Sequence, residues 1–67
     1  MKIGQLAKLC GVSVATVRYY VSMGMLIPND SSAQYDFSER EVEDLNLILK
    51  MRKHQFKLKE IQQYLIL

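Results

Sequence analysis

The sequence has few of the residues that cross-link small proteins or hold metals. Its 67 residues include one cysteine, one histidine and no tryptophan. Because Cys10 has no second cysteine to pair with, an intrachain disulfide is excluded, and a location inside the cell is favoured. No cluster of potential ligands has the spacing of a metal site. We expect Cys10 to be a small core residue and His54 to face solvent near a helix end.

Long apolar runs and glycine-rich loops are missing as well. No apolar run approaches the ~20 residues of a membrane span, and no secretory leader is recognisable. Gly4, Gly11 and Gly24 are scattered, so they do not form a loop that cradles a phosphate. Nothing assembles a nucleophile, a base and a pocket. The sequence therefore predicts no enzyme, no cofactor and no membrane partner.

What is present suffices for one small domain. Apolar residues make up 49% of the chain, although 67 residues lie near the lower limit for a core that folds unaided. The net charge of +2 is unevenly spread: residues 1–28 carry +3, residues 29–49 carry −5 and residues 50–67 carry +4. An anionic partner would approach a cationic end. Ordinary solvated surface charge explains the same pattern, so both interpretations stay open.

The first third of the chain predicts two short helices with a tight turn between them. Apolar residues at helical spacing predict a helix over 3–10, and Gly11 provides its stop. Ser13 is a good N-cap for a second helix, and only two residues separate it from the first. Such a short, glycine-containing turn is typical of a helix-turn-helix, which we place at about 3–23.

The second helix has two different faces. One side holds Val14, Val17, Val21 and Gly24, and another holds Ala15, Arg18, Tyr19 and Ser22. Tyr20 lies at the edge of the apolar side. This helix carries no carboxylate that would repel an anionic partner.

The remaining chain predicts a hairpin and two more helices. Pro28 and the turn-rich residues 29–34 separate two short flanks that we expect to pair as a β-wing over about 27–37. The stretch 38–41 predicts a capping box, in which Ser38 accepts from the first turn and Glu41 reaches back. Helices are expected over about 39–54 and 58–67. The apolar end at 65–67 suggests that the helix continues or meets a partner, and a frayed end remains the alternative.

A helix-turn-helix places its second helix in the DNA major groove, with the N-terminal part nearest the bases. The backbone N–H groups near Ser13 can hold a phosphate. Arg18 can contact a phosphate or a guanine, and Tyr19 can donate its hydroxyl to a phosphate. A helix face with Arg and Tyr is also common on plain protein surface.

Residues 3–26, "IGQLAKLCGVSVATVRYYVSMGML", resemble the start of MerR-family transcription regulators, typically "IGELAKxTGVSxRTLRYYExxGLL". The shared residues are Ile3, Gly4, Leu6, Ala7, Gly11, Val12, Ser13, Thr16, Arg18, Tyr19, Tyr20, Gly24 and Leu26. Residues 35–65 resemble the next part of the same family pattern. The resemblance covers essentially all 67 residues, and the block at 12–20 is its most specific part.

The resemblance implies a winged helix-turn-helix, mainly α, in the order helix, helix, β-wing, helix, helix. It implies a bacterial, cytoplasmic regulator that binds pseudo-palindromic double-stranded promoter DNA as a homodimer and acts there with RNA polymerase. In the family a long coiled-coil helix supplies the dimer contact and a C-terminal domain senses a metal or small molecule. This sequence stops before the positions of both.

The resemblance also implies a set of DNA-contacting residues. They are the backbone amides around Ile3 and Gly4, together with Ser13, Val14, Ala15, Thr16, Arg18, Tyr19, Tyr20 and Tyr35. For Tyr20 we rank a core role above a contact role, and Lys53 and Lys57 are plausible phosphate contacts on charge alone.

Four positions depart from the family pattern. Ala15 and Tyr35 stand where basic residues are usual, Asp36 adds a negative charge to the wing, and Gln55 replaces a helix-ending glycine. These changes put the detailed contacts in doubt more than the mode of binding.

A second functional hypothesis is a protein-interaction module that reuses the helix-turn-helix scaffold. Its binding surface would include Leu47, Met51 and the apolar tail. DNA binding through several phosphates must weaken steeply with salt, whereas apolar binding changes little.

We predict that the isolated chain is a monomer or a weak dimer in dilute solution, because the expected dimer helix is missing. Analytical ultracentrifugation checks this, and a tight dimer would contradict it.

Overall fold

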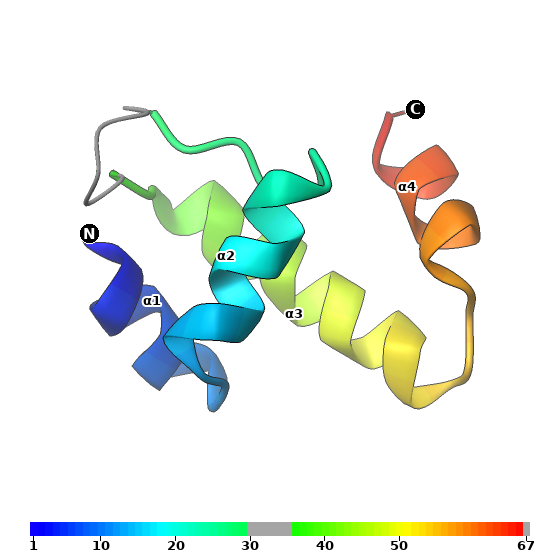
Figure 1. The fold of residues 1–67 in the computed structure, drawn as a ribbon, viewed down its shortest axis with the longest axis horizontal. Coiled ribbons are helices and arrows are strands. Elements are labelled where there is room, and N and C mark those ends of the chain that lie inside the picture. The colour runs from blue at the N-terminus through cyan, green and yellow to red at the C-terminus, as the bar shows by residue number, and fades with distance from the viewer. Residues whose placement is uncertain (30–35, 67) are drawn as a thin grey trace.

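The computed structural model describes the backbone of residues 1–29 and 36–66. Within them lie four helices, α1 (Ile3–Cys10), α2 (Val14–Ser22), α3 (Glu39–Lys53) and α4 (Leu58–Ile66). Helix α1 packs against α2 and α3, and α4 packs against α3 (Figure 1). The predicted mainly α class and the four helices are confirmed. No described helix has the length and apolarity that crossing a membrane requires.

Every helix contributes to one apolar core. Three loop positions complete it: Met25 and Leu26 after α2 are 5% and 1% exposed, and Phe37 before α3 is 1% exposed. The buried residues are Ile3, Leu6, Ala7, Val17, Tyr20, Met25, Leu26, Phe37, Leu45, Ile48 and Ile61. Helices of eight or nine residues are marginal by themselves. Their stability in this chain therefore depends on this shared core.

Helices α1, α2 and α3 end in the same way. In each case a residue in the left-handed conformation follows the helix: Gly11 with φ 70°, Gly24 with φ 74° and Gln55 with φ 67°. After α3 the N–H of Phe56 donates to the carbonyl oxygen of Met51 at 3.0 Å. This is the Schellman arrangement, which satisfies the last carbonyls of a helix. Gln55, which replaces the usual glycine, therefore adopts the conformation that glycine adopts most easily.

The two predicted N-caps have different outcomes. The N–H of Thr16 donates to the Ser13 hydroxyl oxygen at 3.1 Å, so the Ser13 cap of α2 is confirmed. Before α3, the hydrogen bonds predicted for a capping box of Ser38 and Glu41 are wrong. The Ser38 hydroxyl makes no bond to the backbone of the first turn and donates instead to the Glu41 carboxylate. A charged acceptor binds a hydroxyl more strongly than a neutral one, and this carboxylate is nearly fully buried.

The predicted wing is only partly covered by the described residues. No strand occurs within 1–29 and 36–66, and Tyr35 lies outside them. One backbone bond, from the N–H of Asn29 to the carbonyl oxygen of Asp36 at 2.7 Å, joins the two flanks. The Phe37 backbone pairs with Met1, because the Phe37 N–H donates to the Met1 carbonyl at 2.7 Å.

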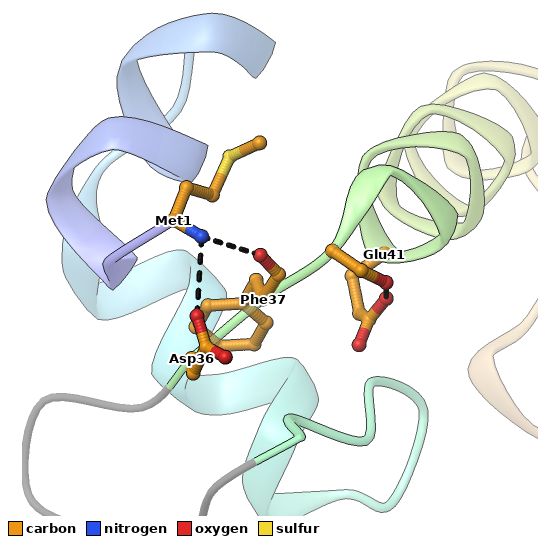
Figure 2. A network of polar contacts seen from close by, with 5 residues as sticks. Met1, Asp36, Phe37 and Glu41 are labelled. Atoms are coloured by element: carbon orange, nitrogen blue, oxygen red, sulfur yellow. Dashed lines mark hydrogen bonds and ion pairs between the residues drawn. The ribbon is translucent and has the colours of Figure 1, made fainter.

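The N-terminus completes this pairing. The Met1 ammonium donates to the Phe37 carbonyl at 2.6 Å and to the Asp36 carboxylate at 3.2 Å (Figure 2). The chain immediately before α3 is thus joined to the chain immediately before α1. Asp36 is well exposed, so this ion pair contributes little to stability compared with the burial of Phe37.

We predict that Gln55→Gly raises the free energy of unfolding by about 0.5–1 kcal/mol, because glycine removes the steric cost of the left-handed conformation. Urea denaturation measures the change. Gly24→Ala is the matched control in the same conformation, and it should lower stability. A Gln55→Gly chain that is less stable than the parent would contradict the argument.

Candidate nucleic-acid interface

The turn between α1 and α2 fixes the first two helices against each other. The N–H of Val12 donates back to the carbonyl of Ala7 at 3.0 Å, and Val12 itself packs against the core. Helix α2 then buries Val17 completely and leaves Tyr20 only 7% exposed. Two buried anchors three residues apart fix which side of α2 faces outward.

The outward face of α2 has the predicted composition. Ala15, Arg18, Tyr19 and Ser22 are all exposed. The Tyr19 ring makes an edge contact with the Tyr20 ring, with centroids 5.5 Å apart and planes at 63°. The Ser22 hydroxyl donates to the Tyr19 carbonyl at 2.6 Å. Tyr19 is therefore held by its buried neighbour while 47% of it stays accessible to a partner.

The beginning of α2 has no negative charge. Its first turn contains no acidic residue, whereas the first turn of α3 contains Glu39 and Glu41. The hydroxyl oxygens of Ser13 and Thr16 are 2.9 Å apart. Ser13 is the N-cap of α2, and Thr16 lies in its first turn. The positive end of the α2 dipole is thus left without a carboxylate, an arrangement that favours an external anion.

The other predicted site residues lie in different surroundings. The Ile3 side chain is buried, so only its backbone remains for a contact, while Gly4 next to it is exposed. Val14 and Thr16 are half-buried. Tyr20 lies in the core, in agreement with the role ranked first for it. The residues brought together on one helix are therefore Ser13, Val14, Ala15, Thr16, Arg18 and Tyr19, and Tyr35 lies outside the described residues.

Two cations flank the turn between α3 and α4. Lys53 ends α3 and Lys57 precedes α4, and both are exposed. The backbone N–H of Lys57 donates to the Glu60 carboxylate at 3.0 Å, which caps the start of α4 from within. Together with the exposed Arg52, whose guanidinium donates to the Phe56 carbonyl at 3.5 Å, these lysines are positive groups that this turn presents to solvent.

An open hollow of about 650 Å³ lies at the C-terminal end of α2. Its lining includes Met23, Ile27, Arg40, Asp44, Gln62 and Leu65. Burial raises the pKa of Asp44; the Arg40 charge opposes this, and the charges of Glu41 and Glu43 add to it.

Burial also raises the pKa of the Cys10 thiol, so the neutral thiol is favoured in its half-buried place beside the core. Among the described residues, no three His, Cys, Asp or Glu side chains are grouped to hold a metal.

One contact at this hollow has no signal in the sequence. The side-chain amide of Gln62 on α4 donates to the carbonyl oxygen of Met23 at 3.0 Å. Met23 is the C-cap residue of α2, 39 positions earlier in the chain. Gln62 occupies a polar position of an amphipathic helix, where periodicity predicts nothing beyond solvent exposure.

Two short helices joined by a tight turn, with a positive and aromatic outer face on the second, define a helix-turn-helix domain. The model of the family described as "MerR HTH family regulatory protein" matches residues 1–66. The chain belongs to this family, and the resemblance noted from its sequence is confirmed.

Individual relatives agree with this assignment. The mercuric resistance operon regulatory protein of Bacillus cereus is 37% identical over 67 residues, which cover 96% of this chain and 50% of that protein. A ZntR homologue of Haemophilus influenzae, an HTH-type transcriptional regulator, is 36% identical over 97% of this chain and 50% of its own length. This chain therefore spans about half the length of the curated relatives that it matches.

A solved structure gives the same result for the fold. The transcription regulator PbrR691 of Ralstonia metallidurans CH34, crystallised with lead(II), superposes with a TM-score of 0.88 at 36% identity. The match covers 97% of this chain and 52% of that one.

We predict that Asp44 lowers stability as pH rises. Its folded pKa lies above its unfolded value of about 3.9, so its favourable contribution is present below that pH. The contribution is lost as pH rises through the raised pKa. Asp44→Asn cannot ionise, so its stability advantage over the parent should grow as pH rises above about 4. Urea denaturation at several pH values measures this.

Glu39→Gln removes one exposed negative charge of the same helix that is not among the charges acting on the Asp44 pKa, and it is the control for charge loss. An equal pH trend in both variants would show that burial of Asp44 is not the cause.

Proposed function

We propose that this chain binds double-stranded DNA through the outward face of α2, as the DNA-binding domain of a MerR-like transcription regulator acting at a promoter. The observation that supports this most directly is the combination of exposed Arg18 and Tyr19 with a carboxylate-free, Ser13-capped helix start. The N-terminal half of α2 would enter the major groove, as the second helix of a helix-turn-helix does.

Each residue has a distinct role in the proposed complex. The amides near Ser13 and Thr16 receive a phosphate, and Arg18 binds a phosphate or the edge of a guanine. Tyr19 donates its hydroxyl to a phosphate and covers sugar with its ring. Val14 and Ala15 offer apolar contact at the start of the helix.

Contacts outside α2 would extend the footprint along the backbone. The amides of Ile3 and Gly4, Lys53 and Lys57 would contact phosphates on either side. Tyr35 would contribute from a short β-wing over about 27–37. Because the wing lacks the usual cation, its contribution should be weaker than that of α2.

The proposal extends to the whole regulator. We propose a cytoplasmic homodimer in which a second half, of the length by which the relatives exceed this chain, supplies the dimer helix and a sensor domain. PbrR691 is a regulator described with bound lead(II), which favours a metal as the class of signal. Pseudo-palindromic promoter DNA and RNA polymerase would be the partners of that assembly.

The alternative function, a protein-interaction module, loses support at two of the residues named for its binding surface. Leu47 and Met51 are both half-buried, and Met51 packs against the core. Neither side chain therefore offers a large apolar area to a protein partner.

We predict that Arg18→Ala weakens binding to a duplex selected by the parent chain from a random library by about 1–3 kcal/mol. Arg18→Lys separates the two roles, because a lysine can replace a phosphate contact but not the fork that reads guanine. The exposed Arg40 on α3 offers Arg40→Ala as the matched control for loss of one arginine. Fluorescence anisotropy at several salt concentrations measures affinity and its salt slope.

Unchanged affinity of Arg18→Ala would remove Arg18 from the site. Binding of the parent chain that does not respond to salt would favour the protein-interaction alternative, since phosphate contacts release counterions.

A further inference from the structure

The end of α2 is joined to α4 by a polar contact across the edge of the hollow. Gln62 and Met23 both line this hollow, and the Gln62 side-chain N–H donates to the Met23 carbonyl at 3.0 Å. The backbone of the same cap is ordered by bonds from Met23 N–H to the Tyr19 carbonyl and from Gly24 N–H to the Val21 carbonyl, each 3.0 Å long, and from Met25 N–H to the Tyr20 carbonyl at 2.9 Å. Gln62 therefore satisfies a carbonyl at the point where α2 stops.

Helix α4 is itself held at a few positions. Ile61, the residue before Gln62, is completely buried, while Leu58 and Leu65 pack against the core from partly exposed positions. The helix packs on α3 and follows the turn at Gln55, whose left-handed backbone is costly for a non-glycine residue. A shift of α4 at this turn would act on α2 through Gln62.

The direction of α2 matters for its outer face. Apolar burial of Val17 and Tyr20 holds the helix against the core, but such contacts are not directional. At 1.5 Å per residue, a tilt of ten degrees about one end of this nine-residue helix moves the other end by about 2 Å. Hydrogen bonds to DNA tolerate errors of only a few tenths of an ångström.

We infer that Gln62 is a positioning residue that fixes the C-terminal end of α2 to α4. The position of α4 against α3 then sets the direction of the proposed DNA-binding face. This inference rests on the DNA-binding function proposed above. It adds a role for a residue that lies outside that face and makes no proposed contact with DNA.

The chain supplies a matched pair of variants for the test. Gln62→Leu has a similar volume and no N–H donor, and Gln63→Leu makes the same exchange at the adjacent, exposed position. A second pair, Gln62→Glu and Gln63→Glu, removes the donor while keeping a polar side chain, and both members change the net charge equally. Thermal unfolding by circular dichroism confirms that all four variants are folded.

Two measurements report on the inference. Amide hydrogen exchange by NMR, without DNA, follows the N–H groups of Gly24 and Met25 at the α2 cap. Fluorescence anisotropy follows affinity and salt slope on the duplex selected by the parent chain. For both Gln62 variants we expect exchange at the cap to rise and affinity to fall by about three- to ten-fold relative to the Gln63 partners, the range produced by one lost hydrogen bond. The salt slope should match that of the partner variant, because no phosphate contact is lost.

The outcomes separate the inference from the function on which it rests. If the parent chain binds its selected duplex and the Gln62 variants match their Gln63 partners in affinity, the positioning role is overturned and the proposed function stands. Unchanged exchange at Gly24 and Met25 overturns the link between α4 and the α2 cap. If the parent chain selects and binds no duplex, the proposed function fails, and the positioning of a DNA-binding face fails with it.

Discussion

The burial of Val17 and Tyr20 determines how the rest of the second helix is presented. Because successive residues of a helix are about 100° apart, placing these two side chains in the core leaves Arg18 and Tyr19 no direction but outward. The two adjacent tyrosines consequently have opposite roles. Tyr20 belongs to the core, and its ring supports that of Tyr19 at the surface. The proposed interface is thus built directly on the core and needs no separate scaffold.

The two helix starts in this chain show how the same element serves folding or binding. Before α3, Ser38 and Glu41 satisfy each other, and acidic residues in the first turn balance the helix dipole internally. Before α2, the serine cap is present but the first turn has no acid. Of these two helix starts, that of α2 is therefore the one that keeps its positive end available to an external anion. This difference supports a phosphate contact at α2 more strongly than the small net charge of the chain does.

Local signals in the sequence predicted most of the helical fold, and long-range contacts are where they failed. Apolar spacing, Ser13 and Gly11 sufficed for α1, for α2 and for the outward direction of Arg18. The same signals gave the wrong bonding partner for Ser38, because the burial of Glu41 depends on the whole fold. No periodicity indicates that Phe37 pairs with Met1 or that Gln62 reaches Met23, since both contacts join residues more than thirty positions apart. The wing, which depends on pairing of two short flanks, is uncertain from sequence for the same reason.

The distribution of contacts also indicates where this domain is most easily altered. Helix α1 packs against both α2 and α3, whereas α4 packs on α3 and, among the described residues, adds one fully buried side chain. Elements with few buried contacts open at lower free-energy cost than the elements around them. The polar contact between α4 and the end of α2 crosses that weaker boundary. A change in α4 would therefore act on the proposed DNA-binding face through the C-terminal end of α2, while the core around Val17 stayed in place.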